Sequence, residues 1–431
     1  MSTTSASLSP VSLEQRISVI DAVRGVAILG ILMMNIPYFS DSAVLADNPF
    51  ILEEKGKNYY TWLVVYGAFE GTMRGLFSLL FGAGAMLLIT RLEKKNDPDV
   101  TPADIYYRRL LWLLGFGLFN AYVLAWPGDI LFTYAIGGLF LYPFRKMKPW
   151  GLVVIGMLII VSLVGRTSYQ WYGYHQERVK GEKALQLKTQ GIKLNDEQNA
   201  QLHTWMMTRP PDATLKAQAE VKETRRSLQK GYVQAVIANA PVTQRFQTTD
   251  FIGGWLLDAL GFFFIGMALY KWDIITGRRS NRFYLIMMFI CLLIGFGISY
   301  HSMSGFVDLK MDKYYFWEKI GLALYQIRRL GQALGYMCLI ILLYKNNVFS
   351  FLWRWLSKVG QMAFSNYLMQ QMICLLIFYV FGYYGKLERY ETYYVVFAIW
   401  IFQIIFSNVW LRYFTYGPFE WLWRRLTYGK Q

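Results

Sequence analysis

Long apolar blocks separated by mostly short polar connections dominate the chain. A helix needs about 20 predominantly apolar residues to cross the roughly 30 Å hydrocarbon core of a bilayer. Inside that core, backbone groups must be hydrogen-bonded within the protein, so blocks of this kind form helices. The pattern predicts an all-α, polytopic integral membrane protein. The ten expected spans are 18–39, 61–91, 107–126, 129–145, 149–168, 249–271, 282–301, 317–344, 360–383 and 391–413.

Lysine and arginine gather in alternate connections between these blocks. Cytoplasmic loops of membrane proteins carry an excess of both residues, which assigns this set of connections to the cytoplasm. With ten spans, both termini are then expected to be cytoplasmic. The clusters are Arg91/Lys94/Lys95/Arg108/Arg109, Arg145/Lys146/Lys148, Lys271/Arg278/Arg279/Arg282, Lys345/Arg354/Lys358 and Arg412/Arg424/Arg425/Lys430.

One connection is long, polar and mixed in charge, and it falls on the external side of this topology. Long loops translocate largely regardless of their charge, so its lysines do not contradict the assignment. Its segment 213–238 is rich in Ala, Lys, Glu and Gln, which predicts a helix and an external lid or cap. We expect one membrane domain overall. Its parts are a cytoplasmic tail (1–15), an N-terminal bundle of five helices (16–168), the external polar loop (169–248), and a C-terminal bundle of five helices with a cytoplasmic tail (249–431).

The net charge of +16 would be compatible with nucleic-acid binding in a soluble protein. Here the basic residues follow the loops, so orientation in a membrane explains them better, and the expected partner is the lipid bilayer. Cys291, Cys338 and Cys374 all lie inside apolar blocks, without the spacing of a disulfide framework or a metal site. We therefore expect no nucleic-acid partner, no metal and no covalently bound cofactor.

The first apolar block contains ionisable and amide side chains. A charge in hydrocarbon costs about 2.5–3.5 kcal/mol on insertion scales, so it usually faces a partner or a cavity. Asp21 and Arg24 are three residues apart, which puts them on one helical face and predicts an ion pair. Asn35 lies roughly 21 Å beyond Asp21, at about 1.5 Å per residue. Two interpretations stay open: an ion pair that steadies helix packing, and a helix that lines a functional cavity.

The second block, 61–91, is longer than one straight crossing, and we expect it to begin with an interfacial or broken segment. Within it, Glu70 and Arg74 are four residues apart and should share one helical face. Glycines recur at every fourth position from Gly67 to Gly75, which permits close helix approach. Two interpretations of this block remain open: close helix packing stabilised by an ion pair, and a helix that lines a cavity.

Three further charges lie inside apolar blocks: Asp258 in the sixth span, and Arg328 and Arg329 near the middle of the eighth. Neighbouring residues on a helix point about 100° apart, so the two arginines cannot easily share one partner. Two guanidiniums inside the membrane indicate a cavity that holds a phosphate or carboxylate. The alternative is neutralisation of the arginines by Asp258 or Glu70.

The third and fourth spans form a hairpin that turns at Pro127 and Gly128. Asp129 opens the fourth span, where a carboxylate can cap free backbone N–H groups. Asn120 lies about two turns before the bend, so an amide and a carboxylate come near the external face together. Capping alone and a substrate pocket are both compatible with this pattern. His301, near the external end of the seventh span, is a candidate proton carrier or an idle, hydrated histidine.

Several ordered motifs give the chain a resemblance to the YeiB-like family, known as domain of unknown function 418, over nearly its whole length. The group is distantly similar to transmembrane acyltransferases, including those that acetylate glucosamine residues with acetyl-CoA. The motifs are R-x-x-x-x-D-A-x-R-G at 16–25, E-G-x-x-R-x-L-F-S-L-L-F-G-A-G at 70–84, Y-R-R-L-L-W-L-L-G at 107–115, G-D-I-L-F-T-Y-A at 128–135, G-M-A-L-Y-K at 266–271, G-Q-M-A-F-S-N-Y-L-x-Q at 360–370 and W-L-R-Y-F-x-Y-G-P-F-E-W-L-W-R-R-L-T-Y-G at 410–429.

The resemblance implies a multi-pass protein of the bacterial plasma (inner) membrane, and its link to acyltransferases is one of fold. The chain also departs from the family. Family members often carry a histidine in the segment before G-D-I-L, where this sequence has Asn120. An asparagine cannot exchange protons, so a general-base role at that position is not expected here.

Two functional hypotheses follow. The first is an acyltransferase that moves an acyl group from a cytoplasmic acyl-CoA-type co-substrate to an external hydroxyl or amine, for example of a glycan. Its donor-binding residues would be Arg16, Arg24, Arg108 and Arg109, and its catalytic candidates Asp129, Asn120, Asn35 and His301.

The second hypothesis is a transporter or export component for a small anionic metabolite, and a non-catalytic membrane protein is the remaining alternative. In the transporter, the intramembrane charges would line an alternating-access path. Those residues are Asp21, Arg24, Glu70, Arg74, Asp258, Arg328 and Arg329.

Overall fold

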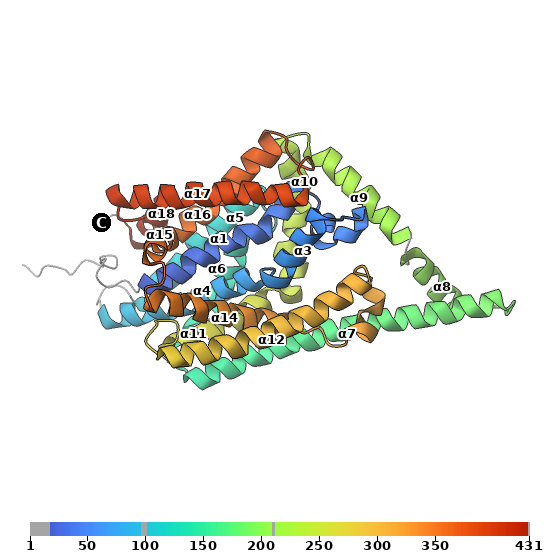
Figure 1. The fold of residues 1–431 in the computed structure, drawn as a ribbon, viewed down its shortest axis with the longest axis horizontal. Helices are drawn as coiled ribbons and strands as arrows, with labels where there is room; N and C mark the ends of the chain where they lie inside the picture. The colour runs from blue at the N-terminus through green and yellow to red at the C-terminus, as the bar shows by residue number, and fades with distance from the viewer. Residues whose placement is uncertain (1–17, 96–100, 209–211, 430–431) are drawn as a thin grey trace, which may run out of the picture.

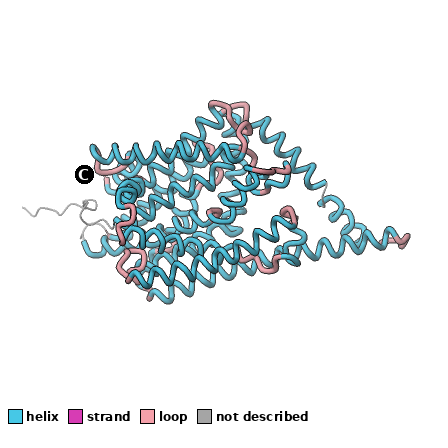
Figure 2. The backbone as a smooth tube through the Cα atoms, viewed as in Figure 1, coloured by secondary structure: helices cyan, strands magenta, loops and turns pink. Residues whose placement is uncertain are grey.

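In the computed structural model, which describes residues 18–95, 101–208 and 212–429, every regular element is a helix (Figures 1 and 2). The predicted all-α class is confirmed. Eight helices are long and apolar enough to cross a membrane, as expected for a polytopic membrane protein. They are α1 (Ser18–Ser40), α3 with α4 (Lys57–Ala68 and Thr72–Lys95), α7 (Pro149–Thr189), α11 with its preceding π-turn (Phe251–Lys271), α12 (Asn281–Asp308), α14 (Tyr325–Lys345), α16 with its following π-turn (Ala363–Val380) and α17 (Arg389–Tyr413).

The two other expected spans correspond to a hairpin of α5 and α6. Helix α5 (Pro102–Tyr122) is long enough to cross but more polar, whereas α6 (Ile130–Leu139) has only ten residues. At about 1.5 Å per residue, α6 is roughly 15 Å long, half the hydrocarbon thickness. The shorter helices are α2 (Ala43–Asp47), α8 (Asp196–Thr208), α9 (Asp212–Leu228), α10 (Tyr232–Gln247), α13 (Phe316–Lys319), α15 (Ser350–Gln361) and α18 (Pro418–Tyr428).

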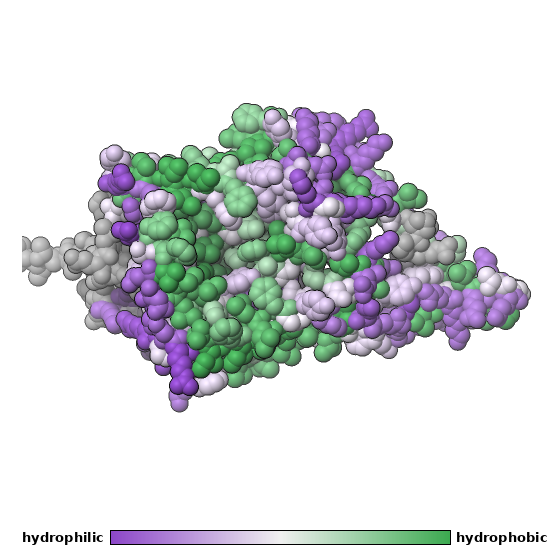
Figure 3. All heavy atoms as spheres, viewed as in Figure 1, coloured by the Kyte–Doolittle hydropathy of each residue, from purple (hydrophilic) through white to green (hydrophobic). Residues whose placement is uncertain are grey.

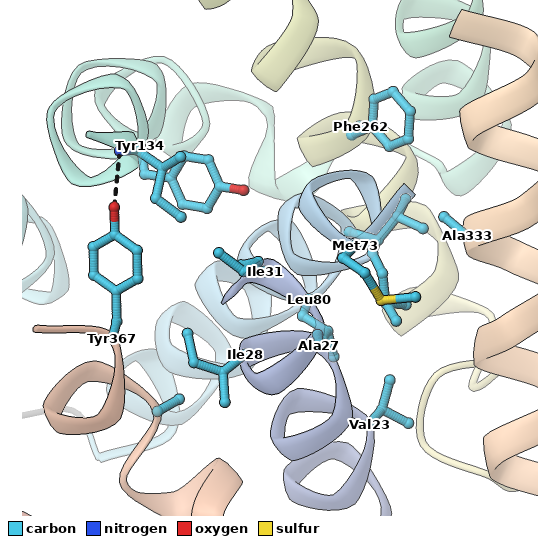
Figure 4. Close-up of a cluster of buried hydrophobic side chains, with 14 of the residues drawn as sticks. Val23, Ala27, Ile28, Ile31, Met73, Leu80, Tyr134, Phe262, Ala333 and Tyr367 are labelled. Carbon is cyan, nitrogen blue, oxygen red and sulfur yellow. Dashed lines mark hydrogen bonds between the residues drawn. The ribbon is translucent and has the colours of Figure 1, made fainter. Parts of the chain in front are cut away.

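Helix α1 lies at the centre of the bundle, in contact with α4, α14, α15, α16 and α17. Its side chains Val23, Ala27, Ile28 and Ile31 belong to a continuous buried cluster that also includes Met73 of α4, Phe262 of α11, Ala333 of α14 and Tyr367 of α16 (Figure 4). Both halves of the chain contribute to this cluster, so they form one hydrophobic core.

Glycine permits the closest crossing in this core, between α1 and α15. A Cβ built on Gly25 would lie 2.1 Å from the carbonyl oxygen of Leu356, and one on Gly360 would lie 1.8 Å from that of Asp21. Any larger residue would force the two backbones apart, which is the use of small residues at membrane helix interfaces. The crossing thereby fixes the position of Asp21 and Arg24 against α15.

The second and eighth blocks are each broken into two helices. Helix α3 ends at Ala68 and α4 begins at Thr72, with Gly71 between them at a φ of 67°, so the expected break is confirmed. In the eighth block, α13 and α14 are separated around Gly321, whose φ is 78°. As a consequence, Arg328 and Arg329 lie near the start of α14 rather than in the middle of a span.

The long polar connection is an extension of the bundle. Helix α7 runs unbroken from the apolar core into it, while α8 and α9 lead back toward the bundle (Figure 1). The expected helix 213–238 is divided into α9 and α10 at Gly231, where φ is 105°. The first and last described residues lie at the opposite end of the molecule from this extension, and an apolar surface separates the two polar ends on the face drawn in Figure 3.

Candidate functional site

A cavity of about 850 Å³ lies among α1, α4, α5, α6, α16 and α18. This volume is in the range of ligand pockets, about 300–1,000 Å³. Five basic and two acidic side chains contribute to its lining: Arg24, Arg91, Lys94, Arg109 and Arg424, with Asp21 and Glu420.

The cavity is basic at one end and aromatic at the other. Along α4, the lining runs from Arg91 and Lys94 back to Phe77, a distance of roughly 20–25 Å at about 1.5 Å per residue. At the Phe77 end, Tyr134 packs against Phe77 and shares a hydrogen bond of 2.7 Å with Ser78. Leucine and phenylalanine side chains line the stretch between the two ends. The shape suits an amphiphile with an anionic head and an apolar arm.

Tyr367 connects the aromatic end to the hairpin between α5 and α6. It lines the cavity and is almost completely buried, and its hydroxyl accepts a hydrogen bond from the backbone N–H of Ile130 at 3.4 Å (Figure 4). The same hydroxyl lies 3.4 Å from Oδ1 of Asp129. Asp129 itself is not among the cavity-lining residues, so Tyr367 separates the carboxylate from the cavity.

The structure brings Asn120 and Asp129 together. Nδ2 of Asn120 donates to Oδ1 of Asp129 at 2.7 Å, and Oδ2 of Asp129 accepts from the backbone N–H of Phe132 at 2.8 Å, capping α6. Asn120 is fully buried, yet its Oδ1 has no hydrogen-bond partner among the described residues. Buried polar atoms are normally paired, so this oxygen marks a place for water or substrate. Asp129 therefore caps α6, and the unpaired oxygen of Asn120 beside it leaves a polar position that a water or substrate could occupy.

The other two catalytic candidates lie elsewhere. Asn35 is half-buried on α1 and has no hydrogen bond to Asn120 or Asp129 among the described residues. His301 is exposed on α12, where its Nε2 lies 3.0 Å from the carbonyl oxygen of Ile320. Of the four candidates, only Asn120 and Asp129 therefore form a cluster.

Of the donor-binding candidates, Arg24 and Arg109 line the cavity. Arg109 also stacks on the ring of Trp423 at 3.7 Å, whereas the neighbouring Arg108 is exposed and donates to the carbonyl oxygen of Thr427 at 3.2 Å. Arg16 lies outside the described residues.

Sequence reasoning missed three basic lining residues, Arg91, Lys94 and Arg424, which we had used only to orient the chain. The spacing of Arg91 and Lys94 on one helical face was an available signal. The sequence carries no comparable local signal that Arg424 reaches the same cavity.

Helix α18 closes one wall of the cavity and is fixed by Glu420. This carboxylate accepts hydrogen bonds from the backbone N–H groups of Phe364 (2.8 Å) and Ser365 (3.0 Å) and from the Ser365 hydroxyl, capping the start of α16. Burial raises the pKa of Glu420, and the hydrogen bonds from Ser365 oppose that shift. This contact joins the motifs at 360–370 and 410–429 in space.

The intramembrane charges form a separate network. Asp258 pairs with the fully buried Arg329 and with Arg74, at 3.4 Å, while Arg328 pairs with Glu70 at 2.7 Å. The two neighbouring arginines thus take different partners, as their angular separation requires. None of these five residues lines the large cavity.

The prediction that Glu70 and Arg74 share one helical face is wrong. The helix break between Ala68 and Thr72 turns Glu70 toward Arg328 and leaves Arg74 for Asp258. In contrast, Asp21 and Arg24 lie on an unbroken part of α1, and Arg24 Nη1 donates to Asp21 Oδ1 at 2.8 Å.

The polar extension covers the hairpin turn beside Asn120 and Asp129. The hydroxyl of Tyr232, on α10, donates to the carbonyl oxygen of Val123 at 2.6 Å, and Asn239 donates to that of Ala125 at 3.0 Å. Helix α10 therefore lies over the side of the site that faces away from the large cavity.

Comparisons with known proteins agree on one family. Residues 269–430 match the family model described as protein of unknown function (DUF418). The chain is 31% identical to the uncharacterized protein YeiB of Escherichia coli (strain K12) over 424 residues, covering 95% of both chains. It is 29% identical to the uncharacterized protein YxaH of Bacillus subtilis (strain 168), over 98% of this chain and 97% of the relative. No solved structure gives a significant match.

Proposed function

We propose, from the premise that this chain belongs to the DUF418 family of YeiB-like membrane proteins, that it is an integral-membrane acyltransferase. Its donor would be an acyl-CoA-type molecule in the cytoplasm, and its acceptor an external hydroxyl or amine, such as that of a glycan. The fold-level similarity of the family to transmembrane acyltransferases supports the proposal by analogy.

The observation that carries the proposal is the polarity of the large cavity. Arginine and lysine at one end provide donors for the phosphates of a coenzyme A, because guanidinium and phosphate form strong, charge-assisted hydrogen bonds. The apolar middle suits the arm that carries the acyl group. The arm would then end at Tyr134 and Tyr367, next to the Asn120–Asp129 pair.

The topology that fits this reaction has ten crossings: the eight long helices, α5, and α6 continued by the 3₁₀ turn Tyr142–Lys146. Both termini and the basic end of the cavity would face the cytoplasm, in agreement with the basic loops. The extension 169–248 would then lie outside a bacterial inner membrane, between two five-helix segments (16–168 and 249–431), with 1–15 as a cytoplasmic tail.

In the proposed step, the acceptor oxygen or nitrogen attacks the thioester carbonyl carbon. The new C–O or C–N bond forms, the C–S bond breaks, and coenzyme A leaves as a thiolate. Asp129 takes the proton of the acceptor through the Tyr367 hydroxyl, which lies between the carboxylate and the cavity, and later returns it to the thiolate by the same route, while Asn120 holds the carboxylate in place. Tyr367, which belongs to the motif at 360–370, would orient the reacting carbonyl from the cavity side.

Transport of a small anionic metabolite ranks second. That hypothesis assigned the transport path to the intramembrane charges. Five of these residues instead form ion pairs with one another and do not line the large cavity: Glu70, Arg74, Asp258, Arg328 and Arg329. Asp21 and Arg24 alone of that set line it.

The test is turnover and binding of radiolabelled acetyl-CoA by the purified, full-length protein. Asp129→Asn should abolish acetyl transfer or hydrolysis and leave donor binding within about twofold, since the substituted group is separated from the cavity by Tyr367. Asn120→His should retain turnover, because family members carry histidine there. Absence of donor binding by the unmodified protein, or unchanged turnover in Asp129→Asn, would contradict the proposal.

A further inference from the structure

A second cavity, of about 340 Å³, lies at the other end of α1. Arg24 lines the large cavity and Pro37 lines this one; thirteen residues separate them, roughly 20 Å at about 1.5 Å per residue. Its walls come from the end of α1, the 45–58 segment, α9 of the polar extension and the 385–392 segment that leads into α17. The two cavities therefore sit at opposite membrane levels.

The lining of this second cavity is charged but balanced. It contains three carboxylates, Asp41, Glu54 and Glu388, and three cations, Arg225, Lys386 and Arg389. The lining as a whole is therefore neutral, which distinguishes it from the basic large cavity.

Arg389 has a structural role. Its guanidinium donates to Glu54 at 2.7 Å and to the carbonyl oxygen of Leu45 at 2.7 Å, and both side chains of the ion pair are nearly buried. All three nitrogens of Arg389 are committed to hydrogen bonds. This pair holds the loop after α1 against the start of α17, and four of the five N–H donors of Arg389 are used in doing so.

Arg225 and Lys386 are different. Arg225 reaches in from α9 and binds both oxygens of Asp41 through Nε (2.9 Å) and Nη2 (2.5 Å), so Nη1 makes no hydrogen bond among the described residues. Asp41 raises the pKa of Arg225, which keeps the guanidinium charged. Lys386 is exposed and makes no ion pair within the described part of the chain, and it follows Gly385, against which the Arg225 side chain packs. Arg225 and Lys386 therefore both line the cavity with N–H donors that no described residue engages.

We propose that this cavity binds a small zwitterion of amino-acid size. Its carboxylate would bind Nη1 of Arg225 and the ammonium of Lys386, and its own ammonium would face Glu388 and Asp41. A dianionic phosphate would meet three carboxylates in a neutral lining and is disfavoured by like-charge repulsion. The volume is at the small end of ligand pockets, about 300–1,000 Å³, which fits a compact solute.

This site gives the polar extension a function. Arg225 is the contribution of α9 to the cavity, and two further bonds hold α9 over it: Gln218 donates to the carbonyl oxygen of Ile51 and Gln229 to that of Tyr384, both at 2.8 Å. The inference is independent of acyl transfer, because it uses neither the large cavity nor Asp129.

The experiment measures equilibrium binding of each of the twenty standard amino acids to the purified full-length protein, with inorganic phosphate and methylamine as additional probes and no acyl donor present. We expect saturable binding of at least one amino acid and none of phosphate or methylamine. Lys386→Gln should weaken that binding by about tenfold or more, because it removes a charge-assisted contact from an exposed residue that the fold does not need. Arg225→Gln should weaken it similarly.

Lys57→Gln is the matched control, since Lys57 is exposed near the same cavity, above the ring of Tyr390, but is not part of the lining. Its binding should equal that of the unmodified protein. The proposal is overturned if no amino acid binds, if phosphate binds equally well, or if Lys386→Gln and Arg225→Gln bind as the control does.

Discussion

The bundle contains two regions rich in arginine, and they differ in how the charge is compensated. In the ion-pair network, Arg74, Arg328 and Arg329 each lie within salt-bridge distance of Glu70 or Asp258. In the large cavity, five basic side chains accompany only two carboxylates. Each arginine of the network thus has a carboxylate partner, with three arginines for two carboxylates, whereas basic side chains outnumber carboxylates five to two among the described residues of the cavity lining.

This difference separates stability from function. Removing charges from water is costly, and partners within the protein offset the cost only while both are present. A lining in which basic side chains outnumber carboxylates attracts anions. We therefore expect substitutions in the network to affect folding, and substitutions in the cavity to affect binding.

The largest effect on stability is expected for Asp258→Asn. The carboxylate is the shared partner of Arg329, which is fully buried, and of Arg74, so its loss leaves a buried guanidinium without its counter-ion. Breaking one partner of a buried pair costs about 3–5 kcal/mol. Thermal unfolding of the purified protein in detergent measures the loss.

Asp250→Asn is the control for that measurement. Its ion pair with Arg245 is accessible to solvent, with 63% of the Arg245 side chain and 34% of the Asp250 side chain exposed. The loss of unfolding free energy should therefore stay within about 0.5 kcal/mol. Equal losses in the two variants would show that the network does not stabilise the bundle.

A smaller effect, measured on donor binding, is expected for Arg109→Gln. Arg109 lines the large cavity, whereas Arg108 next to it does not, so Arg108→Gln serves as the matched variant. A hydrogen bond to a charged group contributes about 1.5–3 kcal/mol, and Arg109→Gln should weaken acetyl-CoA binding by about ten- to a hundredfold. Binding of labelled acetyl-CoA to both variants measures the difference. Similar affinities would remove Arg109 from the donor site.

Local spacing predicted those contacts that stay within one regular helix. It predicted eight of the ten expected spans as long apolar helices, the pair of Asp21 with Arg24, and the divergence of Arg328 and Arg329. It also placed Asn120 and Asp129 at one membrane level, because a tight turn brings the two helix ends together.

Contacts between distant segments could not be predicted in the same way. Arg329 and Asp258 are 71 positions apart and Arg328 and Glu70 are 258 apart, so no helical period relates them. Spacing along a helix also gives the depth of Asn35 but not the direction it faces around the axis. Arg424 reaches the cavity because contacts with α16 and α5, among them those of Glu420 and Trp423, hold α18 in place.

The smallest effect is expected for Asp21 and Arg24, which share features of both the ion-pair network and the large cavity. They form an ion pair like those of the network, yet both line the large cavity, and 26% of the Arg24 side chain is accessible compared with 11% of Asp21. A double-mutant cycle with Asp21→Asn and Arg24→Gln should give a coupling of about 0.3–1 kcal/mol in unfolding free energy, because solvent in the cavity screens the pair. Asp21→Asn should have the larger single effect, since Asp21 is the more buried partner. Repeating the cycle with saturating acetyl-CoA sharpens the result: if Arg24 binds a donor phosphate, its bond to Asp21 competes with that contact, and the coupling should fall. Additive losses in the absence of donor would show that the pair does not interact, and a coupling unchanged by donor would place Arg24 with the structural network instead of the binding site.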